Sequence, residues 1–316
     1  MDNTVSKNLE AFYDCVDESC NYLYEIYHKP YFELIEMTAK NILEARVTQD
    51  LEPADIAKLQ EIYDKIEGID FSVEDVRKAM QAIVLKGFKE MNISNWNTTP
   101  DTLGIFISYF ITKFYDEKQK LNILDPLCGT GNLLLTIANY LKNDVNLFAC
   151  DNDLWMSKLT VILADLLNTP VEMYLQDTLN LNLSNMDVIT FDLPKSEYKD
   201  NKYLPYSWLL KYNSMLKDGG IMIGIVENDF FNYDYDKKFK EELLSTSTIV
   251  GIIELPDSMF LKIKPKCMVV LEKNVVKDRK CFMIKLPSFD DAYEFNKSLK
   301  IIEDWFNKNY KKKEEN

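Results

Sequence analysis

The sequence contains only one histidine, His28, among 316 residues. Hydrolases of the Ser-His-Asp or Cys-His type need a histidine beside the nucleophile, and His28 lies outside the part of the chain that carries the other candidate site residues. The six cysteines form no Cys-x-x-Cys pair and have no histidine cluster beside them, so we expect no metal site. Cys128, Cys150 and Cys267 lie in or beside apolar strand-like runs, which predicts buried free thiols.

Long apolar runs and basic residues are also scarce. No run reaches the roughly 18 apolar residues of a membrane span, and the first residues resemble no signal peptide, so we expect a cytoplasmic protein without a membrane segment. Lys and Arg number 37 against 51 Asp and Glu, a net charge of −14, which argues against an extensive nucleic-acid footprint. We interpret Lys262, Lys264 and Lys266, and the lysines at 311–313, as solvated charges rather than DNA contacts.

What the sequence does contain is an apolar content of 47%, enough for a globular fold. Residues 1–93 show apolar residues at helical spacing, and we predict an N-terminal all-α domain there. Its expected helices cover residues 9–27 and 31–45, a segment beginning at Pro53, and a segment that Ser72 and Asp75 cap and that ends near Met91. The polar segment 92–97 marks the boundary with a second domain, residues 94–316.

In the second domain, predicted strands and helices alternate. After a helix that starts at 99–101 and a strand that ends at Asp125, we expect strands at 146–151, 173–177, 186–192, 221–226, 249–255, 267–273 and 281–286. Predicted helices at 133–141, 156–167, 208–216, 237–244 and 292–306 separate or follow them. This alternation predicts an α/β fold with a mostly parallel sheet, and such sheets bind ligands beyond the carboxyl ends of their strands.

Residues 121–132, LNILDPLCGTGN, are the most informative stretch. A strand runs into Asp125, a tight turn follows at Gly129-Thr130-Gly131, and a helical pattern begins at once, which can place a ligand against the backbone N–H groups of a helix N-terminus. No Lys-Ser/Thr follows the glycines, which argues against a phosphate-binding P-loop. Position 134 is leucine, so the dinucleotide pattern G-x-G-x-x-G is absent, and an oxidoreductase fits less well.

The stretch D-P-L-C-G-T-G-N resembles motif I of class I S-adenosylmethionine (SAM)-dependent methyltransferases. More narrowly, it resembles the N6-adenine DNA methyltransferases of the type I restriction modification subunits and their small stand-alone Firmicute forms. The segments K-D-G-G (217–220) and E-L-P-D-S-M-F (254–260), each followed by an apolar strand, extend the resemblance over about residues 98–273. It implies a Rossmann-like class I methyltransferase sheet with helices on both faces, and SAM as cofactor.

The resemblance also implies residues for the cofactor. Asp151, which ends the second strand, would receive the ribose hydroxyls, with Asp153 as an alternative that could equally cap the next helix. Asp177 would receive the adenine amine of SAM, and Thr99-Pro100 would meet its methionine end or simply cap a helix. The implied cofactor set is Thr99, Pro100, Asp125, Pro126, Cys128, Gly129, Thr130, Gly131, Asn132, Asp151, Asn152, Asp177 and Thr178.

The segment Asp192-Leu193-Pro194-Lys195 stands where amino-group methylases carry (Asn/Asp)-Pro-Pro-(Tyr/Phe/Trp). In the family, the first side chain and a backbone carbonyl hold the target amine, and the aromatic ring stacks on a flipped base. By resemblance the catalytic residues are Asp192, Leu193 and Pro194. Lys195 cannot stack as an aromatic ring does, and Tyr198 is a candidate substitute.

Three functions remain open. The first is a methyltransferase for an exocyclic amine, by resemblance N6 of adenine in DNA, with weak DNA binding or a partner subunit that supplies recognition. The second is the same cofactor site acting on RNA or protein, and the third is a SAM-binding regulator with little catalysis. About 40 residues follow Lys273, fewer than a typical domain of roughly 100, so we expect no target-recognition domain. Tyr22, Tyr24 and Tyr27 could support a homodimer, although a packed core is the favoured interpretation.

Overall fold

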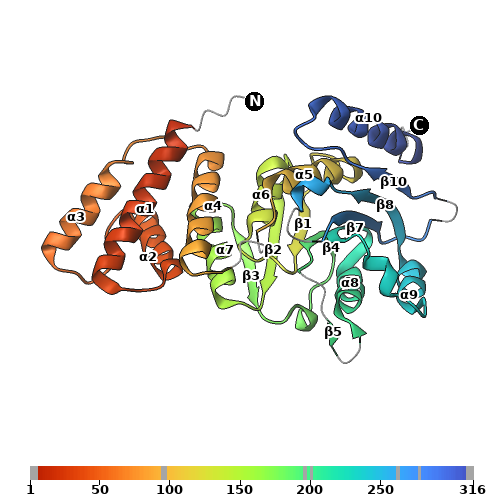
Figure 1. Ribbon diagram of the computed structural model, residues 1–316, viewed down its shortest axis with the longest axis horizontal. Coiled ribbons are helices and arrows are strands. Elements are labelled where there is room, and N and C mark those ends of the chain that lie inside the picture. The colour runs from red at the N-terminus through yellow and green to blue at the C-terminus, as the bar shows by residue number, and fades with distance from the viewer. Residues whose placement is uncertain are drawn as a thin grey trace.

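The computed structural model describes residues 6–93, 98–194, 198–199, 202–260, 264–276 and 279–310. Its first part consists of four helices, α1 (Lys7–Tyr27), α2 (Tyr31–Glu44), α3 (Pro53–Asp64) and α4 (Val73–Glu90), which lie together at one end of the molecule (Figure 1). The predicted cap of α4 is confirmed as a capping box, because Ser72 Oγ accepts the Asp75 N–H at 3.1 Å while the Asp75 carboxylate accepts the Ser72 N–H at 3.2 Å.

The three tyrosines of α1 differ in their surroundings. Tyr22 and Tyr27 pack against the main hydrophobic cluster, and the Tyr22 hydroxyl donates to Asp55 at 2.8 Å. Tyr24 is 54% exposed and meets His28 edge to face. Two of the three rings therefore belong to the packing within the chain, as expected.

The second part alternates strands and helices. The strands are β1 (Leu121–Asp125), β2 (Val145–Asp151), β3 (Val171–Leu175), β4 (Met186–Asp192), β7 (Leu216–Glu227), β8 (Thr248–Glu254), β9 (Lys266–Glu272) and β10 (Phe282–Lys285). The helices are α5 (Asp101–Phe114), α6 (Asn132–Tyr140), α7 (Leu154–Leu166), α8 (Leu204–Met215), α9 (Lys238–Thr246) and α10 (Ala292–Asn309). A short antiparallel pair, β5 (Tyr198–Lys199) and β6 (Lys202–Tyr203), was not predicted.

One sheet holds the eight longer strands in the order β10-β8-β9-β7-β4-β1-β2-β3. Every pairing is parallel except the two that β9 makes with β7 and β8, so the predicted mostly parallel sheet is confirmed. The strand pleat sends Ile123 and Val188 into one hydrophobic cluster and Leu124 and Ile189 into another. The sheet is therefore covered by side chains on both faces.

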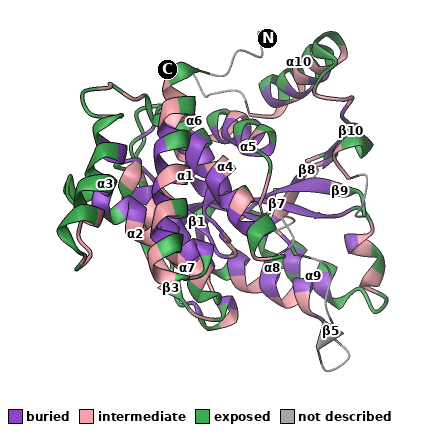
Figure 2. Ribbon diagram, turned by 60° about the vertical axis from the view of Figure 1, so that its left-hand side comes forward, coloured by how far each residue is buried: buried purple, intermediate pink, exposed green. Residues whose placement is uncertain are grey.

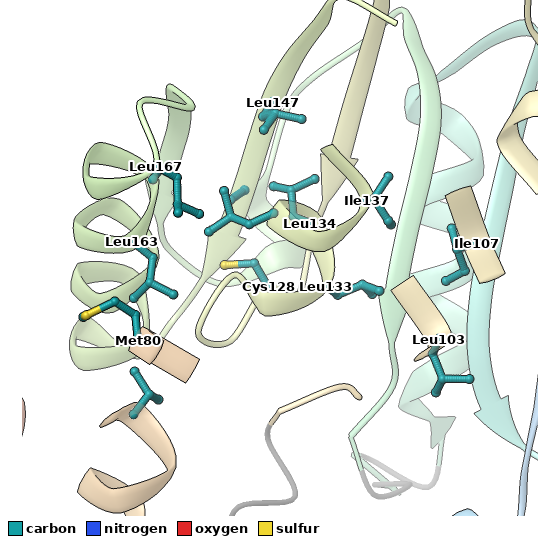
Figure 3. Packing of buried hydrophobic residues seen from close by; sticks show 14 of the residues in the cluster. Met80, Leu103, Ile107, Cys128, Leu133, Leu134, Ile137, Leu147, Leu163 and Leu167 are labelled. Carbon is teal, nitrogen blue, oxygen red and sulfur yellow. The ribbon is translucent and has the colours of Figure 1, made fainter. Parts of the chain in front are cut away.

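Different helices supply the two clusters. Figure 3 shows Leu133, Leu134 and Ile137 of α6 lying between Leu103 and Ile107 of α5 and Leu163 and Leu167 of α7. The opposite face is covered by α8 and α9, through residues such as Trp208, Tyr212 and Phe239. Figure 2 shows the buried residues concentrated in the strands and on the inner sides of these helices, while α3 and α10 carry much of the exposed surface.

The strand β7 begins earlier than predicted. The sequence pattern placed its start at 221, after a turn at Gly219-Gly220, but the strand begins at Leu216 and passes through both glycines. Gly219 adopts φ +75°, and its N–H donates to the Lys273 carbonyl at 2.8 Å while the Lys273 N–H donates to the Gly220 carbonyl at 2.8 Å. The glycines therefore form an irregular strand segment, which coincides with the register shift between Met186 and Val188.

The arrangement of the strands fixes the place of the site. Since β1, β2, β3 and β4 run parallel, their carboxyl ends lie along one edge, and Asp125, Asp151 and Asp192 are the last residues of three of them. Helix α2 packs on α7, and α4 packs on α6 and α7, so the four N-terminal helices lie beside the elements that follow β1 and β2.

The sequence predicted buried free thiols and no membrane segment. Cys128, Cys150 and Cys267 are free and buried, as predicted. Among the helices in the described ranges, none has the length and apolar character that crossing a bilayer requires.

Candidate functional site

A cavity of about 490 Å³ opens at the carboxyl edge of β1, β2, β3 and β4. Most of the residues predicted from the sequence line it: Thr99, Asp125, Pro126, Cys128, Gly129, Thr130, Asn132, Asp151, Asn152, Asp177, Thr178, Asp192, Leu193 and Pro194. Pro100 and Gly131, the N-cap residues of α5 and α6, do not line the cavity. Lys195 lies outside the described residues, and so does the side chain of Tyr198.

The glycine turn between β1 and α6 is held from several sides. Gly129 and Gly131 have φ of +54° and +77°, in the left-handed region that glycine tolerates. The Gly129 N–H donates to the Asp151 carboxylate at 2.9 Å, and Thr160 Oγ1 donates to the Gly129 carbonyl at 2.9 Å. A Cβ at Gly131 would lie 2.9 Å from Thr160 Cγ2, so the second glycine allows α7 to approach the turn closely.

Asp125 is the most deeply placed acid of the cavity. Its side chain is 1% exposed, and one of its oxygens accepts the Leu127 N–H at 3.1 Å. Burial raises the pKa of Asp125 to about 8, and the nearby Asp151 and Asp192 add to the rise. The carboxyl group is therefore largely protonated at neutral pH, unless a cation binds beside it.

The carboxyl groups in the cavity indicate which cofactor fits. Asp125, Asp151 and Asp192 all line the cavity beside the glycine turn. A sulfonium or an α-ammonium group would favour ionisation of these carboxyl groups and pair with them, whereas a pyrophosphate would add further negative charge beside them. The residues present thus fit the methionine part of SAM and do not fit a dinucleotide. No cluster of three or more His, Cys, Asp or Glu side chains suited to a metal occurs within the described ranges.

Three acids at or just beyond the strand ends also stabilise local structure. Asp153 accepts the N–H groups of Trp155 and Met156 at 2.7 and 3.0 Å, so it caps α7, the alternative that the sequence left open. Asp177 accepts the Leu179 N–H at 2.9 Å and caps a short 3₁₀ turn. Asp151 accepts the N–H groups of Gly129 and Asp153, one on each oxygen, and burial raises its pKa. Because each carboxylate oxygen can accept more than one hydrogen bond, Asp151 and Asp177 retain capacity for ligand hydroxyl or amine groups.

Lys266 is a cavity residue whose role the sequence did not reveal. Its Nζ donates to Asp192 Oδ1 at 2.5 Å and to the Leu193 carbonyl at 2.8 Å, and its side chain is 13% exposed. The other Asp192 oxygen, Oδ2, accepts the Thr99 hydroxyl at 3.0 Å. The expectation that Lys266 is a solvated charge is therefore wrong, because its ammonium is held inside the site.

The topology explains why Lys266 reaches the site. Lys266 is the first residue of β9, which runs antiparallel to β7, and it lies opposite Glu227 at the carboxyl end of β7. Lys264 precedes β9, is 54% exposed and pairs with Glu227 and Asp229, so it fits the expected surface charge better. Lys262 lies outside the described residues. A parallel β9 would have put Lys266 at the opposite edge of the sheet, and sequence patterns alone do not give strand direction.

A buried arginine connects the N-terminal helices to the cavity. Arg77 of α4 is 1% exposed, and its guanidinium donates to both oxygens of Asp101 at 3.0 and 2.7 Å and to Thr136 Oγ1 at 2.9 Å. Asn132 Nδ2 in turn donates to Asp101 Oδ1 at 3.0 Å and to the Thr99 carbonyl at 2.8 Å. Burial opposes ionisation of Asp101, but the hydrogen bonds from Arg77, Asn132 and Gln81 and the Arg77 charge together outweigh it and lower the Asp101 pKa. Arg77 of α4 therefore fixes the segment that positions Thr99, through Asp101 and Asn132.

Comparison with known proteins gives two family matches. Residues 10–88 match the model of the YtxK N-terminal helical domain, and residues 98–315 match the model of the N-6 DNA methylase family. The protein YtxK of Bacillus subtilis, described as uncharacterized, is 29% identical over 94% of this chain and 97% of its own length.

Solved structures agree with these matches. A crystal structure from Listeria monocytogenes, provisionally described as a class I SAM-dependent methyltransferase, is 28% identical, with a TM-score of 0.85 over 95% of this chain and 99% of that one. The methyltransferase subunit of a type I restriction-modification system from Streptococcus thermophilus is 16% identical, with a TM-score of 0.65 over 96% of this chain and 76% of that one. At 16% identity, the similarity to the Streptococcus thermophilus subunit shows a shared fold.

Proposed function

Because this chain belongs to the N-6 DNA methylase family, we propose that it transfers the methyl group of SAM to an exocyclic amine, and that this amine is N6 of adenine in DNA. SAM is the cofactor of this family of class I methyltransferases.

One observation carries the proposal. The Asp192 carboxylate and the Leu193 carbonyl bind the same nitrogen, at 2.5 and 2.8 Å, and that nitrogen belongs to an amino group, Nζ of Lys266. An exocyclic amine has two N–H groups, so two convergent acceptors can bind both of them and fix the direction of the nitrogen lone pair. Bound SAM supplies an activated methyl group, so positioning and orientation of the amine are the main tasks left to the protein.

Thr99 supports this arrangement from the second Asp192 oxygen. Its hydroxyl donates to Asp192 Oδ2 at 3.0 Å, which leaves Oδ1 as the oxygen directed to the amine. Thr99 itself is held through its carbonyl by Asn132. Thr99 therefore orients Asp192, in addition to its expected contact with the methionine end of SAM.

For the cofactor, we propose that the glycine turn and Asp125 hold the methionine part, Asp151 the ribose hydroxyls and Asp177 the adenine amine. All these residues line one cavity. Burial raises the pKa of Asp125 to about 8, which suits a carboxyl group that ionises when a cationic ligand arrives.

For DNA, we propose weak, salt-sensitive binding, with sequence recognition supplied by a partner subunit. The net charge of −14 supports this part of the proposal, since affinity for DNA depends on the neutralisation of phosphates by Lys and Arg. An RNA or protein amine is the alternative acceptor for the same pair of hydrogen-bond acceptors.

A SAM-binding protein with little catalysis is the second candidate. The observation that favours it is that Lys266 already occupies the two acceptors meant for the substrate amine. In this case SAM would bind with normal affinity but no acceptor would be methylated.

Transfer of tritiated methyl groups to DNA, RNA and protein from a cell extract tests the proposal, with Asp192→Ala as the control. We expect labelled DNA with the wild type and none with the variant, at SAM concentrations that calorimetric titration shows to saturate each protein. SAM binding without label in any acceptor would favour the second candidate. Calorimetric binding of NAD in place of SAM would contradict the whole assignment.

A further inference from the structure

The ammonium group of Lys266 fills the position proposed for the substrate amine. It donates to Asp192 Oδ1 and to the Leu193 carbonyl, and Asp192 Oδ2 is taken by Thr99. Among the described residues that line the cavity, Lys266 is the only one with a positively charged side chain. When no substrate is bound, Lys266 therefore satisfies both hydrogen-bond acceptors.

This contact has a physical reason to exist when no substrate is bound. The Asp192 side chain is 18% exposed, and a carboxylate and a carbonyl in such a place would lose free energy if they stayed unpaired. Lys266 satisfies both. Lysine carries its charge on a flexible four-carbon stem, so the ammonium can leave by rotation of the side chain without movement of β9.

We infer that Lys266 is an internal competitor for the acceptor amine, so that a substrate amine binds only when it displaces the Lys266 ammonium. The inference rests on the proposed function, because it takes Asp192 and the Leu193 carbonyl as the amine-binding pair. The substrate exchanges one set of hydrogen bonds for another and therefore gains less affinity than it would from an open pair. Lys266 thus sets the affinity for the amine.

A matched pair of variants separates this role from general effects of charge. Lys266→Met removes the competing ammonium and keeps an unbranched apolar stem. Lys264→Met removes a lysine two residues away, whose ammonium instead contacts Glu227 at 3.3 Å, Asp229 at 3.1 Å and the Tyr233 hydroxyl at 3.1 Å. Both variants change the net charge by the same amount.

The test measures the binding of two random-sequence single-stranded DNA pools in the presence of S-adenosylhomocysteine, which has no methyl group to transfer. One pool contains only adenine and thymine, and the other contains purine in place of adenine, so that the second pool has no exocyclic amine. Loss of a lysine weakens the phosphate contribution equally for both pools. The ratio of the two dissociation constants therefore isolates the contribution of the amine.

We expect Lys266→Met to increase the preference for the adenine pool over the purine pool by about tenfold or more, as expected for release of two acceptors from a charged donor. Lys264→Met should leave the preference at the wild-type value. An unchanged or smaller preference in Lys266→Met, or binding of neither pool by that variant, would overturn the inference.

A second measurement uses the wild-type protein and does not depend on how well a variant folds. The acetylation rate of Lys266, followed by mass spectrometry and divided by that of Lys264, should rise at least severalfold when the adenine pool is added and stay constant with the purine pool. An equal response to both pools would overturn the inference.

A larger amine preference in Lys266→Met together with no methyl transfer by any variant would reject the proposed function alone. Methyl transfer by the wild type with no change in amine preference would reject the inference alone.

Discussion

The buried Arg77 of α4 forms an ion pair with Asp101, the first residue of α5, with Nη2 and Oδ2 2.7 Å apart. The pair joins the N-terminal helices to the segment that carries Thr99, and Glu74 at 2.8 Å completes the surroundings of the guanidinium. An arginine that is 1% exposed needs such partners, since an unpaired buried charge is expensive.

Replacement of Arg77 by leucine should lower the free energy of unfolding by about 3–5 kcal/mol, because Asp101, which is 19% exposed, would keep its charge without its partner. Urea unfolding followed by circular dichroism measures the change. Lys78→Met is the matched control, since Lys78 is 48% exposed and its pair with Glu74 is a surface contact. The control should change the free energy by less than about 1 kcal/mol. A similar small change for Arg77→Leu would mean that the pair adds little to the junction.

The raised pKa of Asp125 predicts a pH dependence of stability. Its folded-state pKa of about 8 lies above its unfolded-state value of about 4, so the protonated group favours the folded state, and this contribution is complete below pH 4 and lost as the pH rises through 8. Asp125→Asn removes the titration. The free energy of unfolding of the ligand-free variant, relative to the wild type, should therefore rise by a few kcal/mol between pH 4 and pH 8. If the prediction is wrong, urea titrations at several pH values would show the same difference in the free energy of unfolding between variant and wild type at every pH.

The same group predicts proton release on SAM binding. A cation beside Asp125 favours the ionised carboxylate, so binding near pH 7 should release a proton into the buffer. Calorimetric titrations in two buffers with different ionisation enthalpies should give different binding enthalpies for the wild type and similar ones for Asp125→Asn. Equal enthalpies for the wild type in both buffers would place the SAM cation away from Asp125.

Gly131 and Gly68 provide a matched test of the glycine turn. Both have a left-handed φ, +77° and +74°, but a Cβ at Gly131 would lie 2.9 Å from Thr160 while a Cβ at Gly68 has open space around it. Gly68→Ala should cost about 1–2 kcal/mol from the backbone alone. Gly131→Ala should cost about 1–3 kcal/mol more, from crowding against α7, and should weaken SAM binding. Equal losses in urea unfolding would show that the turn tolerates the methyl group.

Several parts of the fold were predictable because the deciding interactions are local. The cap of α4 depends on Ser72 and Asp75, three residues apart, and the order of strands and helices follows from their apolar periodicity. The strand-end acids Asp125, Asp151 and Asp192 meet because parallel strands bring their carboxyl ends to one edge.

The parts that were missed depend on contacts between distant segments. Lys266 reaches Asp192 across 74 positions of the sequence because β9 runs antiparallel, and Arg77 reaches Thr136 across 59. The cap formed by Asp153 was left open for another reason, because a strand-end acid can serve a ligand or a helix N-terminus, and one sequence does not distinguish them.

We propose that Asp192 and the Leu193 carbonyl hold an exocyclic amine for methylation by SAM. Incubation of DNA with the protein and methyl-deuterated SAM, followed by mass spectrometry of the nucleosides, tests it most directly. We expect deuterated N6-methyldeoxyadenosine with the wild type and none with Asp192→Ala, each at saturating SAM. The same product from Asp192→Ala would show that Asp192 does not hold the amine.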